Sequence, residues 1–430
     1  MIPIGADCPF GPFPPGAILA GMQPYDSPEE AAFRAEARAW LKVHAEPYDE
    51  PPVTASAIVA EWTPEEEEQR LGAARRWQRT KYEDGWAGIS WPREYGGRGG
   101  TLIQQLIFSQ EEARFDVPHD ALVVGLGWCG PAVLQHGTEA LKRQMLPPLL
   151  RGDEVWCQLF SEPAAGSDSG AMETRALRDG DEWVITGQKV WTTFAHRSDW
   201  GLCVARHNPD LPKHRGLTAF IVDMEDPGVE CRPLRQMTNS ANFNEVFLEG
   251  VRVPDERRVG EVGDGWRVVI TTFMYERYGG SFSGGGIVES LRALLIESGR
   301  AGDPEMRDRF AGLYARAQAL RYNSLRLLTA VSHGRLPGPE GSIMKLAGTL
   351  LLSDIYEFAL DLLGPQALLV GAATPWDGEW QDAFLGAPGL RIGGGTDQIQ
   401  RNIIGERVLG LPPDIRVDKD VPFSRIPNRA

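Results

Sequence analysis

Cysteine is scarce and scattered in this chain of 430 residues. Its five cysteines stand singly, without the CxxC or CxxH spacing of a metal site or a redox motif: Cys8, Cys129, Cys157, Cys203 and Cys231. An odd, dispersed set argues against disulfides and against a zinc site. The set indicates reduced, buried thiols in a cytoplasmic protein, and no metal is expected.

Long apolar runs and an excess of basic residues are missing too. No run approaches the length that spans a bilayer, so we expect no membrane span. The net charge of −15 gives no support for nucleic-acid binding, although local arginines and helix N-termini still allow an anionic ligand. The N-terminal stretch lacks a basic region and is broken by prolines, which argues against a signal peptide. We expect residues 1–25 to form a loose arm.

Two familiar catalytic signatures are absent or incomplete. The glycine runs at 279–280 and 284–286 do not form a strand-associated GxGxxG, which argues against a Rossmann NAD site. Ser342-Ile-Met-Lys345 has the SxxK spacing of penicillin-binding enzymes, but no KTG accompanies it. We therefore interpret Ser342 as a capping residue of a bundle helix.

The pattern of apolar residues divides the chain into three parts. Residues 26–153 read as helices, beginning with capping boxes at Ser27 and Thr63. Further helices are predicted across 103–114, 121–135 and 138–150. Residues 154–262 form short β-rich runs separated by turns, with a hairpin at Asp179-Gly180-Asp181, which predicts a small antiparallel β domain. The predicted strands are 156–160, 173–177, 183–186, 189–193, 200–206, 217–222 and 244–248. Residues 263–430 return to helical spacing and predict a C-terminal helical bundle.

The stretch from Trp156 to Thr193 carries the chemistry. It contains FSEPAAGSD, followed by GQKVWTT. Pro163 and Gly166 exclude a helix in the first segment, and Ser161, Ser167 and the local N–H groups offer a cluster of donors. Such a cluster suits a carbonyl edge or a phosphate, although alone it is typical of a polar turn between strands.

Together these two segments resemble the signature of the acyl-CoA dehydrogenases, which are FAD-dependent flavoproteins. The family has a Ser/Thr-Glu-Pro-x-Ala-Gly-Ser-Asp turn and, about two dozen residues later, a Lys-x-Trp-x-Thr strand. The resemblance extends to GWAGISWPREYGGRGG, QHGTEALKRQMLPPLLRGDEVW, VRVPDERRVGEVGDGW and GGGTDQIQRNIIGERVLGLP. It implies a mainly α fold with a central β domain: an N-terminal helical domain, a small antiparallel β domain and a C-terminal helical bundle.

The resemblance also implies a reaction and its cofactor. A buried carboxylate removes the proton α to the thioester carbonyl of an acyl-CoA, and a hydride leaves the β carbon for FAD. The product is a trans-2-enoyl-CoA, and electron-transfer flavoprotein accepts the electrons, as in β-oxidation of fatty acids and other lipids.

The family's cofactor contacts map onto matching residues of this chain. Trp191 would pack against the isoalloxazine ring, and Thr193 would lie near its N5 edge. Phe160 and Ser161 would line the pyrimidine side, with Gly166 in the same turn, and Ser167 resembles the serine where the FAD and CoA entrances meet.

A C-terminal segment of the family reaches the FAD of an adjacent subunit. Thr396 and Gln398 match that segment, so the resemblance implies self-association as a dimer or tetramer, or association with a homologous second subunit. The family's Arg-x-x-Phe-Gly contact to the partner's FAD is absent around Ile296–Arg309.

The expected catalytic carboxylate is missing from its usual place. Most members carry it directly before the Gly-Thr pair, where this chain has Gly394. A minority place it in a Glu-Arg pair on an earlier helix, and here Glu276-Arg277 matches. We therefore predict Glu276 as the base, with Arg277 beside it, against the alternative of a surface Glu-Arg pair. Gly394 would border the substrate and leave room for a branched or ring-bearing acyl group.

Two other functions remain open from the sequence. The chain could be a non-catalytic subunit that shares an FAD site with a partner that supplies the base. It could also be a flavin oxidase or hydroxylase on the same fold. His196 and Asp199 follow the WTT strand, but a loop that leaves a strand is a routine place for both residues, so we do not predict a catalytic pair.

Overall fold

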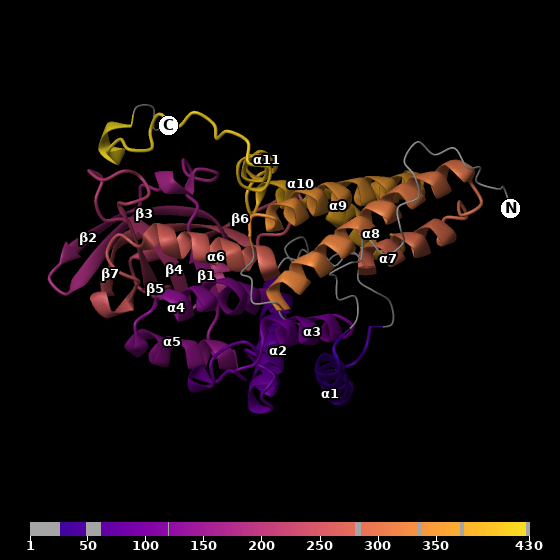
Figure 1. Cartoon of the computed structure of the whole chain (residues 1–430), viewed down its shortest axis with the longest axis horizontal. Coiled ribbons are helices and arrows are strands. Elements are labelled where there is room, and N and C mark those ends of the chain that lie inside the picture. Colours follow the sequence, from indigo (N-terminus) through magenta and orange to yellow (C-terminus); the bar gives the residue numbers. More distant parts are fainter. Residues whose placement is uncertain are drawn as a thin grey trace.

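The protein is described here by a computed structural model, which covers residues 26–48, 62–118, 120–279, 285–332, 338–369 and 374–426. Figure 1 shows a β-sheet beside a layer of N-terminal helices, with an elongated bundle of C-terminal helices extending away from them. The helices before the sheet are α1 (Pro28–His44), α2 (Pro64–Glu83), α3 (Leu102–Glu112), α4 (Gly130–His136) and α5 (Glu139–Arg151). The helices after it are α6 (Gly265–Gly279), α7 (Gly285–Glu297), α8 (Pro304–Ser332), α9 (Gly341–Leu363), α10 (Glu379–Ile392) and α11 (Asp397–Ile403).

The N-terminal helices begin where the sequence predicts. Ser27 and Thr63 each accept a hydrogen bond from the backbone N–H three residues later, and Glu30 and Glu66 bond back to the cap N–H. These reciprocal bonds satisfy N–H groups that have no partner inside the helix. Both capping boxes are therefore confirmed.

The sheet contains eight strands in the order β6-β7-β3-β2-β4-β5-β8, with β1 paired to β4. Their bounds are β1 (Trp156–Leu159), β2 (Arg175–Asp179), β3 (Glu182–Thr193), β4 (Trp200–Arg206), β5 (Leu217–Asp223), β6 (Val229–Leu234), β7 (Phe243–Pro254) and β8 (Arg258–Val259). The hairpin at Gly180 is confirmed by the antiparallel β2–β3 pair. The sheet is mostly antiparallel, as expected, but it is mixed, because β1 runs parallel to β4 and β2 meets β4 in parallel at one residue pair.

Two strands differ from their sequence patterns for identifiable reasons. The runs 183–186 and 189–193 belong to one long strand, β3, whose pairing with β7 shifts register twice. Each irregularity interrupts the alternation of inward and outward side chains, so the strand reads as two. Strand β6 lies at the sheet edge, where a polar strand that contains Pro233 is tolerated.

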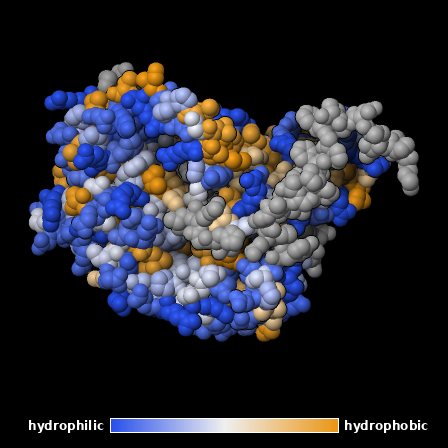
Figure 2. Space-filling view, viewed as in Figure 1, coloured by the Kyte–Doolittle hydropathy of each residue, from blue (hydrophilic) through white to orange (hydrophobic). Residues whose placement is uncertain are grey.

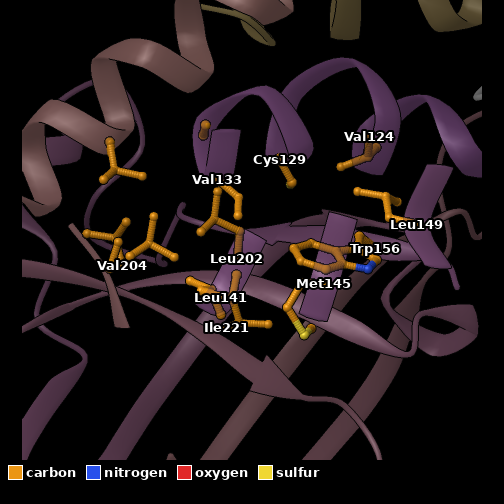
Figure 3. Close-up of a cluster of buried hydrophobic side chains, with 14 of the residues drawn as sticks. Val124, Cys129, Val133, Leu141, Met145, Leu149, Trp156, Leu202, Val204 and Ile221 are labelled. Carbon is orange, nitrogen blue, oxygen red and sulfur yellow. The ribbon is translucent and has the colours of Figure 1, made fainter. Parts of the chain in front are cut away.

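A large apolar core joins the N-terminal helices to the sheet. Figure 3 shows Val133 of α4 and Met145 of α5 facing Leu202 and Ile221 of the sheet, with Trp156 among them. Trp156 is only 1% exposed. Val268 and Val269 of α6 belong to the same cluster, so the first turns of α6 are anchored on the sheet side of the molecule.

The segment after α11 returns from the helical bundle to the β domain (Figure 1). The buried ring of Phe423 lies under the Arg206 guanidinium, with 3.4 Å from the guanidinium carbon to the ring centroid. Lys213, in the loop between β4 and β5, donates to Asp418 of this segment and to Asp168, each at 2.7 Å. The C-terminal segment is thus tied to the turn that follows β1.

Candidate active site

The two halves of the central motif are joined by a buried ion pair. Nζ of Lys189 in β3 lies 2.7 Å from Oε1 of Glu162, and their side chains are 0% and 5% exposed. Lys189 also donates to the carbonyls of Phe160 and Val204, at 3.1 and 2.8 Å. Burial opposes ionisation of Glu162, but Lys189 and nearby N–H groups hold the pKa of this carboxyl below its ordinary value.

This ion pair explains why the Glu-Pro turn and the Lys-x-Trp strand occur together. Glu162 accepts hydrogen bonds from the backbone N–H groups of Glu173 and Thr174, at 2.6 and 3.0 Å. The carboxylate therefore fixes the turn, and Lys189 fixes the turn to the strand. Sequence reasoning missed both roles, although the glutamate of one motif and the lysine of the other carry opposite charges and could have been predicted to pair.

Trp191 is held in an unusual conformation at the end of β3. Its φ is +58°, its ring is 60% exposed, and the adjoining register shift with β7 falls between Lys189 and Thr192. A positive φ is a genuine outlier for a bulky residue, and strand irregularities often redirect a side chain beside an active site. The indole meets Phe243 edge to face, 6.0 Å between ring centroids, and its other surface is available for a planar ligand.

The remaining predicted residues of the β domain lie on β3 and in the turn after β1. Thr193 is half-buried and pairs with Phe243, while Thr192 points into the interior. The Ser161 carbonyl accepts a hydrogen bond from Val190 N–H at 2.9 Å, which places the turn beside β3. Gly166 and Ser167 are exposed in the same turn. The structure therefore brings the turn and the Trp191 strand together.

Phe160 connects this region to the helix that carries the predicted base. Its buried ring meets Phe273 of α6 at 71°, with 6.0 Å between the ring centroids. Glu276 lies three residues after Phe273 in α6, and residues at this spacing are neighbours on one side of a helix. Arg277 follows within α6, but its side chain lies outside the described part of the chain.

Gly394 and Glu276 converge on one point. A Cβ built on Gly394 would lie 3.2 Å from Oε1 of Glu276 and 4.0 Å from Cε of Lys345. Gly394 belongs to a short loop between α10 and α11, which we call the glycine loop (Gly393–Gly395). The half-buried Glu276 carboxylate therefore occupies the space toward which a side chain at position 394 would project.

The segment after the glycine loop presents the other predicted residues. Thr396 caps α11 and accepts a hydrogen bond from Ile399 N–H, so its hydroxyl serves the helix start. Gln398 is exposed on α11. Ser342 is not the predicted cap of α9, because that helix begins at Gly341 and the Ser342 side chain is buried within its first turn.

The helix predicted across residues 121–135 is broken beside α6. A π-helical turn, η4 (Gly125–Cys129), precedes α4, and three glycines lie at positions 125, 127 and 130. Such turns are frequent at functional sites. Burial raises the pKa of the Cys129 thiol well above its ordinary value, with smaller contributions from Cys157 and Glu276, so the turn lies close to the candidate base.

His196 and Asp199 have structural partners. The ring nitrogens of His196 contact Asn244 Oδ1 and Glu67 Oε1, at 3.0 and 2.9 Å. Asp199 accepts a hydrogen bond from Val155 N–H at 2.6 Å. Both residues fix the loop after β3.

In the described ranges, no three histidine, cysteine or acidic side chains gather as a metal site would require. Among the helices of the same ranges, none has the length and apolar character of a membrane span.

Three family descriptions match consecutive parts of the chain. They are the acyl-CoA dehydrogenase N-terminal domain at residues 27–153, the middle domain at 157–251 and the C-terminal domain at 263–409. These matches, with the observed architecture, confirm the predicted fold class.

Individual proteins agree with this assignment. Acyl-CoA dehydrogenase IpdE1 of Mycobacterium tuberculosis is 36% identical over 392 residues, which is 89% of this chain and 98% of IpdE1. Acyl-CoA dehydrogenase FadE34 of the same organism is 41% identical over 329 residues, 75% of this chain, but the match spans only 44% of FadE34. A solved structure titled Tcur3481-Tcur3483 steroid ACAD aligns with a TM-score of 0.76 and 27% identity, over 91% of this chain and all of that one.

Proposed function

Because the chain belongs to the acyl-CoA dehydrogenase family of flavin-dependent oxidoreductases, we propose that it dehydrogenates an acyl-CoA thioester with FAD and that Glu276 is the base. The observation that carries this proposal is the convergence of Gly394 and Glu276. Most members place their carboxylate at the position of Gly394, and a Cβ there would lie 3.2 Å from Oε1 of Glu276. A carboxylate is thus delivered to the same place from a different helix.

In the proposed dehydrogenation, Glu276 removes a weakly acidic proton. A proton α to a thioester needs a base within hydrogen-bond reach and a carbonyl oxygen held by donors. The Glu276 carboxylate is half-buried between α6 and the glycine loop, where less water competes for it. Phe160 and Phe273 close the apolar side and help to exclude water from the reacting carbons.

The residues of the β domain fit a flavin. Trp191 offers an exposed indole face beside the Ser161 turn, and Ser167 and Gly166 offer exposed polar backbone in the same turn. FAD held there would supply an acceptor for the hydride of the β carbon, and Glu276 would take the α proton. Trp191 would pack against the isoalloxazine ring, Thr193 would lie near its N5 edge, and Phe160 and Ser161 would line its pyrimidine side. Thr396 and Gln398 would serve the FAD of a neighbouring subunit.

The acyl group we propose is bulky, of steroid or branched character. Glycine at 394 removes a side chain beside the base and so leaves room for a larger acyl group. The Tcur3481-Tcur3483 protein is named a steroid ACAD, which supports the same class of substrate. Electron-transfer flavoprotein is the proposed electron acceptor, and the scattered thiols favour the cytoplasm.

A second candidate is an FAD-sharing subunit of a heteromeric dehydrogenase. Two observations favour it: position 394 carries no carboxylate, and the Tcur3481-Tcur3483 title joins two proteins in one enzyme. Figure 2 shows apolar surface on and beside α11, where Leu409, Leu411, Ile415 and Val417 are each more than half exposed. A surface of this kind suits association with another subunit.

An anaerobic titration distinguishes the two candidates. The protein purified alone with FAD is titrated with straight-chain, branched and steroid-like acyl-CoA thioesters, and Glu276→Gln serves as the matched variant. Bleaching of the flavin absorbance by one class, and its loss in Glu276→Gln, is expected of a self-sufficient dehydrogenase. Flavin that binds only when a second chain is added, or bleaching that Glu276→Gln leaves intact, would contradict the proposal.

A further inference from the structure

The glycine loop is held at two consecutive carbonyls. Nζ of Lys345, in the first turns of α9, donates to the Gly395 carbonyl at 2.7 Å. Nε2 of Gln400, in α11, donates to the Gly394 carbonyl at 2.8 Å. The loop is thus hydrogen-bonded to two helices, α9, which precedes it in the sequence, and α11, which follows it.

The loop needs such ties because its backbone is intrinsically free. Gly394 and Gly395 have φ values of +64° and +92°, which side chains other than glycine rarely adopt. Three successive glycines also lose the most conformational entropy on ordering. Without external bonds, the loop would sample many shapes, including shapes that collapse onto Glu276.

The buried amide of Gln400 beside the glycine loop lowers the stability of the folded state. Its side chain is fully buried, and its Oε1 has no hydrogen-bond partner among the described residues. Leaving a buried polar atom unpaired destabilises the folded state, whereas a leucine of similar volume carries no such cost. A Cβ at position 395 would lie 2.6 Å from Nε2, so the amide is pressed directly against the loop. The advantage of the amide over a leucine is therefore the hydrogen bond that Nε2 donates to the loop.

We propose that Lys345 and Gln400 are positioning residues that clamp the glycine loop and keep open the space over Glu276; this inference rests on the proposed function. The clamp acts on the place where the α carbon of a thioester must approach the carboxylate. In a trans peptide the C=O and N–H groups point in opposite directions, so the two bonds also fix the direction in which the loop's N–H groups face. An ordered donor at that point would hold the thioester oxygen.

Two variants remove one grip each. Lys345→Met keeps the length of the side chain without its amine, and Gln400→Leu keeps volume without the amide. Hydrogen–deuterium exchange of the peptide that spans residues 391–400 reports on the loop without any need for activity. Stopped-flow reduction of the bound flavin by the best thioester reports on the reaction.

We expect the loop to exchange at least about tenfold faster in both variants. We also expect flavin reduction to slow about 10- to 100-fold, because a displacement of about 1 Å near the reacting atoms costs rates of that order. Bound flavin should be unchanged. Lys345→Arg, which keeps a donor, should recover most of the rate. Asp354→Asn, which removes an exposed ion pair with Arg316 elsewhere on α9, should change neither measurement.

Other outcomes would overturn the clamp. Unchanged loop exchange in both variants would show that the two bonds do not order the loop. Faster exchange with an unchanged rate of reduction would show that the order of the loop does not matter for the reaction. A wild-type protein that no thioester reduces would instead contradict the proposed function, and the exchange measurement would still decide whether the clamp exists.

Discussion

Lys189 and Glu162 form an ion pair in the interior of the β domain, 2.7 Å apart, with almost no exposure to water. Each partner also binds backbone groups of a different segment, so the pair connects β3, the turn after β1 and the start of β2. It stabilises the platform on which Trp191 and the Ser161 turn stand. The two charged residues of the sequence signature, Glu162 and Lys189, therefore have a structural role.

Lys189→Met is expected to destabilise the protein by about 3–5 kcal/mol, because it leaves a carboxylate buried without its counter-ion. The free energy of unfolding from urea denaturation measures this. Arg252→Met removes two exposed ion pairs in the same sheet, with Asp179 and Glu182, and should cost far less stability. Equal losses of unfolding free energy in the two variants would show that the buried ion pair contributes no more to stability than the exposed ones.

Glu276→Gln is expected to slow flavin reduction by about a hundredfold to ten-thousandfold, which is the range for loss of a general base. Anaerobic stopped-flow absorbance measures the rate, and the absorbance of bound flavin shows that the cofactor site survives. Glu289→Gln, an exposed residue of α7, is the control. A rate within twofold of the wild type would assign proton removal to another group.

The base should be transferable between positions 276 and 394. In the double variant Glu276→Gly/Gly394→Glu, the new side chain starts where the old carboxylate lies, so part of the activity lost in Glu276→Gly should return. Full recovery is not expected, because a positive φ at position 394 costs a non-glycine residue about 1–2 kcal/mol. Steady-state assays with an artificial electron acceptor compare the variants, and no gain over Glu276→Gly would count against the shared location.

Glu67 should make the protein sensitive to acid. Its carboxylate binds His196 and Arg197, each at 2.9 Å; burial opposes its ionisation, but these partners hold its pKa below the ordinary value. A lowered pKa in the folded state adds stability above the unfolded-state pKa of about 4.3, and this stability is lost as pH falls through the folded-state pKa.

Chemical denaturation between about pH 6 and pH 3 measures this contribution. The free energy of unfolding should fall more steeply toward acid pH in the wild type than in Glu67→Gln. Glu65→Gln, on an exposed part of the same helical turn, should follow the wild type. Parallel curves for all three proteins would show that Glu67 is not linked to folding.

Local features of the fold were predictable from the sequence. The capping boxes at Ser27 and Thr63 and the hairpin at Gly180 depend on residues within a few positions of one another. Strand β6 was missed because an edge strand needs no clear apolar alternation, and η4 was missed because a π-helical turn has no period of its own.

The candidate site divides in the same way. Glu276 was predicted from a resemblance and from the absence of a carboxylate at position 394. The contacts of Lys345 and Gln400 with the glycine loop were not predicted, because a hydrogen bond to a backbone carbonyl leaves no mark on the residue that accepts it. Lys345 lies 50 residues from its partner, so no local spacing reveals the contact.

The return of the C-terminal segment changes how the helical bundle can move. The chain leaves the β domain at α6, passes through the bundle, and returns after α11 to the same domain through Phe423 and Asp418. A domain attached at one end can rotate about that attachment, whereas a domain attached at both ends cannot rotate freely about either one. The bundle is therefore attached to the β domain at two places, through α6 and through the contacts of Arg206 and Lys213 with the returning segment, and this double attachment restricts rotation of one part against the other.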